Sequence, residues 1–170
     1  MDRGYVQVYT GDGKGKSTAA FGLAVRARGA GLSVCIVQFI KSMEYHELGA
    51  LRELGILVHQ FGRGCFIRST PEPEDRAAAF RGLSFVRELL TKTPPHVLVL
   101  DEVNVALDLG LVDLESVLEL LACRPRTLEL VCTGRGAPPE LLEAADLVTE
   151  MVARKHYYER GVQARDGIER

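Results

Sequence analysis

Residues 10–18 read TGDGKGKST, and this stretch decides the fold class. Residues 5–9, which precede it, are rich in β-branched and aromatic side chains and predict a strand. Residues 19–27, which follow it, predict a helix. A strand, a glycine-rich turn, a Lys-Ser pair and a helix in this order form the context of a phosphate-binding loop. We therefore expect a ligand with several phosphate groups at this turn.

Each residue type in the loop has a physical reason to be there. Glycines adopt positive φ, so backbone N–H groups can close around phosphate oxygens, and the helix adds its positive end. Lys16 supplies a mobile charge for the phosphates, and the Ser17 hydroxyl can ligate Mg²⁺. Thr10 departs from the usual motif, which begins with Gly or Ala. The alternative, a glycine-rich turn before an ordinary helix, is less favoured because a matched strand and helix flank the motif. The predicted nucleotide-binding residues here are Thr10, Gly11, Asp12, Gly13, Lys14, Gly15, Lys16, Ser17 and Thr18.

Length and composition narrow the class of protein. A chain of 170 residues with 46% hydrophobic content predicts a single globular domain. The formal net charge of −2 argues against a nucleic-acid partner. The four cysteines form no CxxC pair, so a structural zinc site is not expected. Because no signal peptide or long apolar run is recognisable, we expect a cytoplasmic, soluble protein without a membrane partner.

Apolar runs alternate with amphipathic segments along the rest of the chain. Such alternation predicts an α/β fold with right-handed crossovers. We expect a P-loop NTPase-like (RecA-like), mostly parallel sheet of about six strands with helices on both faces. Residues 1–154 would form this nucleotide-binding domain, and the polar tail, residues 155–170, would pack near the active site. Further strands are predicted at 33–40, 56–61, 96–102, 126–132 and 146–152, and helices at 44–54, 74–91, 113–121 and 138–145.

Polar residues stand at the predicted carboxyl ends of several strands, where ligands of parallel α/β sheets bind. Asp101 and Glu102 end a buried strand and, with Ser17, predict a Mg²⁺–nucleotide site. The alternative is a solvated pair of carboxylates. In many ATPases the second carboxylate orients a hydrolytic water, so this pattern by itself favours ATP hydrolysis. Arg135 would contact phosphate in a bidentate way, or be a plain surface arginine.

In combination the motifs resemble the ATP:corrinoid adenosyltransferases of the bacterial cobalamin pathway, of the cob(I)yrinic acid a,c-diamide type. The resemblance extends over nearly the whole chain, through residues 9–22, 38–41, 101–104, 133–138, 145–151 and 161–169. It implies transfer of the 5′-deoxyadenosyl group of ATP to the Co(I) of a reduced corrinoid, with inorganic triphosphate as the leaving group. On this basis the catalytic residues are Lys16, Glu102 and Arg135. Ser17 and Glu102 would ligate Mg²⁺, supported by Asp101.

The same resemblance assigns the corrinoid side of the site. The irregular loop 62–73 aligns with the family segment that covers the corrinoid, and a loop of this length is either functional or a poorly ordered connection. Cys65 and Ile67 occupy positions that are usually aromatic in the family, so Phe66 and Ile67 are the expected apolar wedge. Lys41 is a further expected corrinoid contact. The chain starts almost at its first strand, so the tail or a partner subunit would close the site.

Partners and rival functions follow from these expectations. The resemblance implies ATP and cob(I)alamin or a corrinoid precursor as substrates, an electron-donating reductase, and a homodimer. One rival is a small P-loop ATPase or nucleotide switch, which would release ADP and phosphate without a corrinoid. Another is a non-catalytic carrier of adenosylcorrinoid, which would bind tightly without turnover.

Overall fold

A six-stranded sheet forms the middle layer of the computed structural model, which describes residues 2–43, 45–64 and 70–169. The strand order is β3-β2-β4-β5-β1-β6, and each neighbouring pair is parallel. The predicted α/β class with a parallel sheet is thus confirmed. The strands are β1 (Val6–Thr10), β2 (Val34–Gln38), β3 (Leu57–Gln60), β4 (Val97–Asp101), β5 (Glu129–Thr133) and β6 (Leu147–Glu150).

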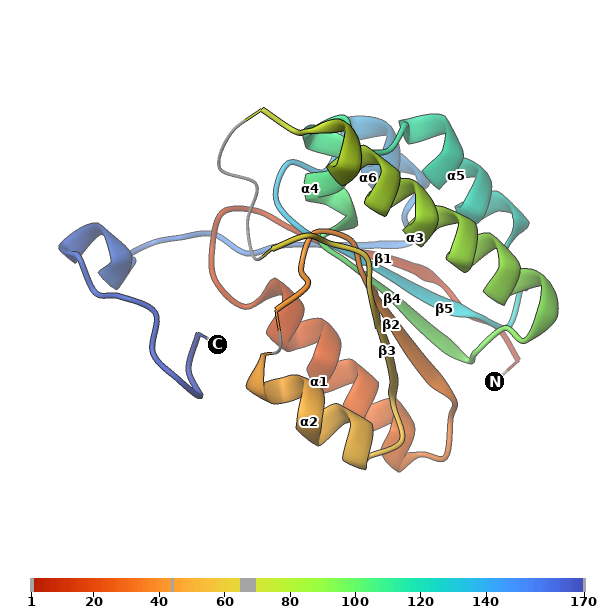
Figure 1. Ribbon diagram of the computed structural model, residues 1–170. Helices are drawn as coiled ribbons and strands as arrows, with labels where there is room; N and C mark the ends of the chain where they lie inside the picture. Colours follow the sequence, from red (N-terminus) through yellow and green to blue (C-terminus); the bar gives the residue numbers. More distant parts are fainter. Residues whose placement is uncertain (1, 44, 65–69, 170) are drawn as a thin grey trace.

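Helices cover both faces of this sheet, as expected (Figure 1). One hydrophobic cluster packs the first two helices on one face, and a larger cluster packs the next four on the other. All four helices predicted after the first begin and end within two residues of the expected positions. The helices are α1 (Lys16–Gly29), α2 (His46–Glu53), α3 (Pro73–Lys92), α4 (Val103–Asp108), α5 (Leu114–Cys123) and α6 (Pro139–Ala144), followed by the 3₁₀ helix η1 (Tyr157–Arg160).

The helix α4 is the α-helix that the sequence did not predict. It contains only six residues, two of them valines, and follows directly on β4. The chain turns from strand to helix at Glu102, whose φ of 62° lies in the left-handed region that non-glycine residues rarely adopt. Local pattern does not reveal such a turn, because Glu102 reads as the polar end of a strand. Its strained backbone suggests a functional constraint.

Burial explains why β2 and β4 are continuous apolar runs. All five residues of each strand are buried, because helices cover both faces of the sheet. Two of these buried residues are polar, Gln38 at the end of β2 and Asp101 at the end of β4, and they lie opposite each other in the parallel register. Polar side chains therefore lie at the carboxyl edge of the sheet, directly above its buried apolar core.

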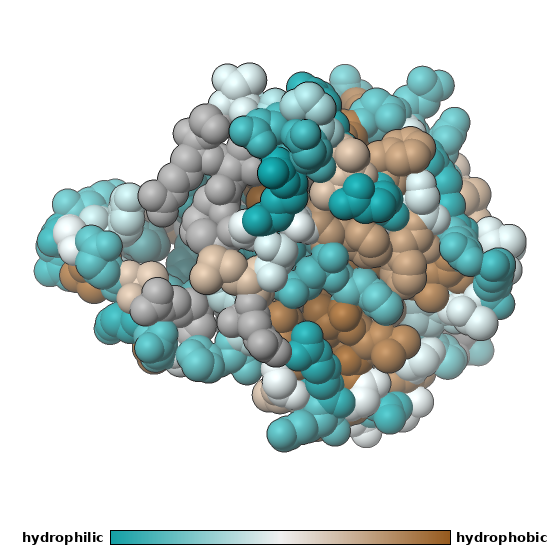
Figure 2. Space-filling view, viewed as in Figure 1, coloured by the Kyte–Doolittle hydropathy of each residue, from teal (hydrophilic) through white to brown (hydrophobic). Residues whose placement is uncertain are grey.

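The outer surface has an apolar region over β3 and α3 (Figure 2). Leu57 on the edge strand β3 and Phe80 on α3 are 59% and 63% exposed. No helix of the described residues is long and apolar enough to cross a membrane.

Candidate active site

The phosphate-binding loop packs directly against the chain that follows β6. Gly11 and Gly15 have φ values of 91° and 119°, as the glycine spacing requires. Gly13 donates its N–H to the Met151 carbonyl at 2.6 Å, and a Cβ on Gly11 or Gly13 would lie 2.6 Å from that same oxygen. The glycines are thus needed for close backbone approach as well as for positive φ.

Lys16 lies within the loop. Its Nζ donates to the carbonyls of Gly11 at 2.6 Å and Gly13 at 2.7 Å. Burial, together with the positive charge of Arg135, lowers the pKa of Lys16. Arg135 is therefore near enough to act electrostatically on the same loop. That both residues face the phosphates stays a prediction.

Asp101 is the central residue of a buried hydrogen-bond network at the ends of β4, β5 and β2. Its Oδ1 accepts from Ser17 Oγ and Thr133 Oγ1, both at 2.7 Å. Its Oδ2 accepts from Gln38 Nε2 at 2.8 Å and from Lys41 Nζ at 3.0 Å. A carboxylate offers about four acceptor positions, and four donors occupy them here. Asp101 therefore fixes the orientation of Ser17 and Lys41.

Charges in this network perturb one another. Burial by itself would raise the pKa of Asp101, but Lys41 and the three uncharged donors together lower it. Burial outweighs the attraction of Lys41 at Glu102, so the pKa of Glu102 is raised, with a further contribution from Asp101. Lys41 is itself desolvated, yet the two carboxylates raise its pKa. We conclude that Lys41 and Asp101 form a charged pair, beside a Glu102 that protonates more readily than usual.

The segment after β5 positions Arg135. Gly134 has a φ of 133°, and a Cβ there would lie 2.9 Å from the backbone nitrogen of Val105. Asn104, fully buried on α4, donates its Nδ2 to the Gly134 carbonyl at 3.0 Å. Because Thr133 Oγ1 also accepts from the Glu102 backbone N–H at 3.1 Å, the loops after β4 and β5 form one unit.

Gln38 and Gln60 extend the network toward the segment after β2. Gln60 Nε2 donates to Gln38 Oε1 at 3.0 Å and to the Met43 carbonyl at 2.9 Å. Sequence reasoning assigned no role to Gln38, Gln60 or Thr133. The available signal was that each is a polar residue at the carboxyl end of a strand.

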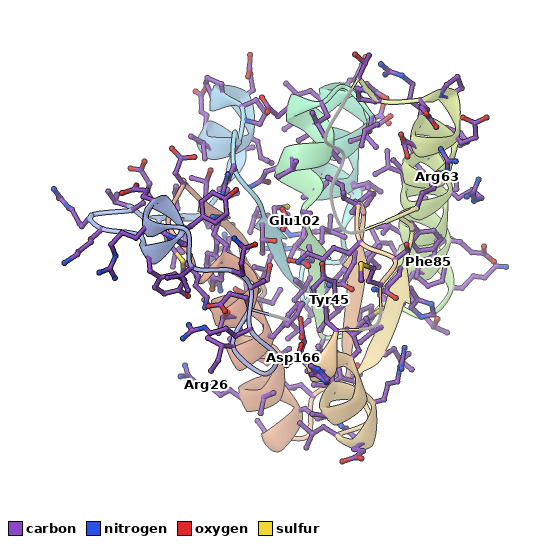
Figure 3. The ribbon with its side chains drawn as sticks, turned by 60° about the vertical axis from the view of Figure 1, so that its left-hand side comes forward. Arg26, Tyr45, Arg63, Phe85, Glu102 and Asp166 are labelled. Atoms are coloured by element: carbon purple, nitrogen blue, oxygen red, sulfur yellow. The ribbon has the colours of Figure 1, made fainter. Side chains whose placement is uncertain are left out.

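The tail contacts the phosphate-binding loop through Lys14. Lys14 Nζ lies 2.8 Å from Glu169 Oε1, 3.0 Å from Tyr157 Oη and 3.2 Å from the Ile168 carbonyl. The tail continues toward α2, where His46 Nε2 lies 3.9 Å from Asp166 Oδ1. Asp166 is labelled in Figure 3. Lys14, predicted to bind nucleotide, thus has protein partners in this structure, and tail and loop are held together.

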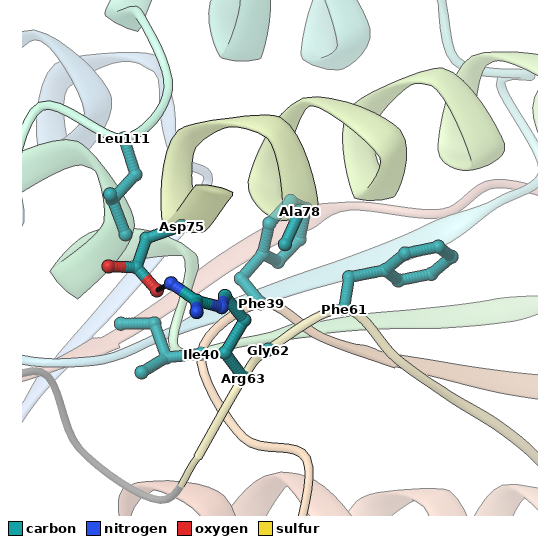
Figure 4. A pocket seen from close by; sticks show the side chains of 8 residues that line it. All are labelled: Phe39, Ile40, Phe61, Gly62, Arg63, Asp75, Ala78 and Leu111. Carbon is teal, nitrogen blue, oxygen red and sulfur yellow. Dashed lines mark ion pairs between the residues drawn. The ribbon is translucent and has the colours of Figure 1, made fainter. Parts of the chain in front are cut away.

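On the corrinoid side, the structure describes only the margins of the loop at 62–73. Cys65, Phe66 and Ile67, the expected corrinoid contacts, lie outside the described residues. The backbone of Lys41 pairs with Gly64 in a parallel bridge, but the Lys41 side chain points to the carboxylates. Next to Gly64, Arg63 lies 3.7 Å from Asp75 beside a cavity of about 10 Å³ (Figure 4), room for about one water molecule.

The oxygen atoms at the centre of the site fit a magnesium ion. Ser17 Oγ, Asp101 Oδ2 and Glu102 Oε1 all lie within 3.4 Å of one cationic atom, Lys41 Nζ. Hydroxyl and carboxylate oxygens, completed by water and substrate phosphates, are the ligands that Mg²⁺ prefers. The set holds only two carboxylates, and no group of three or more His, Cys, Asp and Glu side chains in the described part of the chain could hold a metal ion, so the ion would need water and substrate oxygens as its other ligands.

Two solved structures are similar to this chain in fold. The solved structures of the flagellar accessory protein FlaH from Methanocaldococcus jannaschii and a KaiC-like protein from Pyrococcus horikoshii match with TM-scores of 0.55 and 0.53, at 13% and 14% identity. They cover 88% and 90% of this chain, which covers 72% and 74% of theirs, and they support the P-loop NTPase-like fold alone.

Sequence relatives are more specific. Corrinoid adenosyltransferases from Pseudomonas aeruginosa and Escherichia coli strain K12 are 39% and 36% identical over 99% of this chain, and the matches cover 84% and 86% of those proteins. The family model of the ATP:corrinoid adenosyltransferases BtuR/CobO/CobP matches residues 2–170. The chain therefore belongs to the ATP:corrinoid adenosyltransferase family.

Proposed function

We propose that this protein transfers the 5′-deoxyadenosyl group of ATP to the Co(I) of a reduced corrinoid and releases inorganic triphosphate. The observation that carries the proposal is the family match over residues 2–170, combined with a phosphate-binding loop whose lysine and neighbouring arginine act on one another. The electron pair of Co(I) forms the bond to C5′ while the C5′–O bond breaks, and the triphosphate leaves with the electrons of that bond.

The proposed roles of the residues follow from what this reaction requires. Co(I) carries no proton to remove, so the protein has to align the two substrates and stabilise charge on the leaving group. The loop N–H groups, Lys16 and Arg135 would hold the triphosphate. Ser17, Asp101 and Glu102 would hold Mg²⁺, and this ion would neutralise part of the charge of the triphosphate. The ion pair of Glu102 with Lys41 at 3.4 Å supports a cation-binding role over the activation of water.

Several wider features are part of the proposal. We propose Phe66 and Ile67 as an apolar wedge against the corrinoid, an external reductase as the electron source, and a homodimer, all supported by resemblance to the family. A cytoplasmic location is supported by the described cysteines, Cys35, Cys123 and Cys132, which are free thiols. Light scattering after gel filtration measures the oligomeric state directly.

One assay tests the central reaction. The protein is incubated with MgATP, with and without chemically reduced corrinoid, and the phosphate product is identified. We expect triphosphate only when the reduced corrinoid is present. ADP released at the same rate without corrinoid would identify a P-loop ATPase, and tight corrinoid binding without turnover would identify a carrier.

Lys16→Ala is the matched variant for this assay. Lys16 makes its hydrogen bonds within the loop and not to the hydrophobic core, so the fold should persist. We expect turnover to be lost while the circular dichroism spectrum is unchanged. A rate equal to that of the wild type would show that the loop is not the ATP site.

A further inference from the structure

The Lys41 ammonium lies at the point where the proposed cation ligands converge. Its Nζ is 3.0 Å from Asp101 Oδ2, 3.4 Å from Glu102 Oε1 and 3.4 Å from Ser17 Oγ. We propose that Lys41 and the divalent cation compete for these oxygen atoms, so that cation binding displaces the Lys41 side chain. This inference rests on the proposed function, because it concerns the cation that accompanies ATP.

The donors around Asp101 differ in a way that supports exchange. Ser17, Thr133 and Gln38 are uncharged donors held by the loop and the strand ends. Lys41 is the one charged donor among the four in the described site. A divalent cation can therefore replace the Lys41 ammonium at Asp101 Oδ2, while the other three hydrogen bonds keep the carboxylate in its orientation.

Electrostatics makes simultaneous occupancy unfavourable. The Lys41 side chain is 12% exposed, and Asp101 is fully buried, so water screens the charges weakly. The two carboxylates carry two negative charges. They can neutralise the single charge of the ammonium or both charges of a divalent cation, but not the two cations together. A Mg²⁺ within ligand distance of Ser17 and Glu102 would lie close to Nζ and repel it.

The backbone of Lys41 would stay in place when its side chain moves. Lys41 pairs with Gly64 in a parallel bridge, and the Ser42 N–H donates to the Gly64 carbonyl at 2.8 Å. In its present position Nζ already lies 5.7 Å from the Tyr45 ring centroid, so a rotation toward that ring would keep a cation–π contact while the ammonium leaves the carboxylates. Displacement is therefore a side-chain rotation at a fixed strand end, next to the margin of the loop at 62–73.

Mn²⁺ titration followed by electron paramagnetic resonance tests the proposal on the whole protein without ATP or corrinoid. Lys41→Met removes the ammonium and keeps a long side chain, whereas Lys41→Arg keeps the charge. Lys92→Met is the matched control, because it changes the net charge equally at an exposed ion pair with Glu88. We expect Lys41→Met to bind Mn²⁺ about tenfold or more tightly than wild type, and Lys92→Met to bind it like wild type.

Three results would overturn the proposal: equal affinities of wild type and Lys41→Met, an equal gain in Lys92→Met, or no Mn²⁺ binding in any variant. Adenosyl transfer measured on the same preparations shows separately whether the proposed function holds.

Lys41→Met leaves two carboxylates without their partner and can fail to fold. A measurement on the wild type alone then decides. A brief acetic anhydride pulse, read by mass spectrometry, should label Lys41 several times faster with saturating Mn²⁺ than without it, with Lys92 as internal reference. Unchanged or slower labelling of Lys41 would refute displacement.

Discussion

Replacing Gln38 by leucine tests whether the buried network around Asp101 stabilises the fold. Gln38 is fully buried, and it joins Asp101 at 2.8 Å to Gln60 at 3.0 Å. Leucine has a similar volume, so packing changes little, but both hydrogen bonds are lost. A hydrogen bond to a charged group contributes about 1.5–3 kcal/mol and one between neutral groups about 1 kcal/mol. Allowing for the apolar gain of leucine, we expect a loss of about 2–3 kcal/mol.

The loss is measured by urea unfolding followed by circular dichroism, because the chain contains no tryptophan. For a domain of this size, the same change lowers the melting temperature by roughly 5–10 °C. Gln60→Leu is the control, since it removes the neutral bonds and leaves all four donors on Asp101. Gln38→Glu should cost more than Gln38→Leu at neutral pH, because it adds a third carboxylate to the site of Asp101 and Glu102.

The pH dependence of this loss has a defined sign. The pKa of Asp101 is lowered in the folded protein, so its charged interactions contribute stability above the unfolded-state pKa of about 4. This contribution disappears as the pH falls through the folded-state pKa. The difference between wild type and Gln38→Leu should therefore be largest near neutral pH and shrink in acid. A loss below about 0.5 kcal/mol at pH 7, or one that grows in acid, would refute the reasoning.

Three further predictions concern single contacts. Gly134→Ala should lower the free energy of unfolding by about 1–3 kcal/mol and weaken ATP binding, because Gly134 has a positive φ. Gly22→Ala, with no neighbour within 4 Å of the new Cβ, should raise the free energy of unfolding in urea by up to about 1 kcal/mol. Equal effects of the two substitutions would contradict this reasoning. Glu169→Gln should speed tryptic cleavage of the tail without lowering the melting temperature, because its bond to Lys14 is an exposed one; unchanged cleavage would mean that this pair does not hold the tail. Asp113→Ala should cost about 1 kcal/mol by removing the N-cap of α5, and a loss near zero would show that water replaces that cap.

Local signals in the sequence were sufficient for most of the fold. The phosphate-binding loop was predicted because its glycine positions, its Lys-Ser pair and the flanking strand and helix are adjacent in the chain. The apolar runs that became β2 and β4 were predicted because strands covered on both faces contain little else. The helix α4 was missed because its start depends on the positive φ of Glu102, which no local residue pattern indicates.

The sequence predicted which residues form the candidate site better than it predicted how their side chains are arranged. Lys16, Ser17, Asp101 and Glu102 were selected as chemically suitable groups, and the structure brings Ser17 and Asp101 to 2.7 Å. The direction of the Lys41 side chain was not predictable, because its partners are distant in sequence. Its assignment to the corrinoid and that of Phe66 remain predictions.

The sequence by itself predicted a loop that binds polyphosphate and carboxylates for a cation, and it determined membership in a family of adenosyltransferases. These conclusions depend on residues that are neighbours in the chain, or on motifs in a fixed order. Only the tertiary structure decided that Asp101 has four donors, that the Lys41 ammonium is one of them, and that the tail contacts Lys14. Those facts depend on the parallel register of β2 and β4 and on contacts across up to 155 positions in the chain, where distance in sequence carries no information on distance in space.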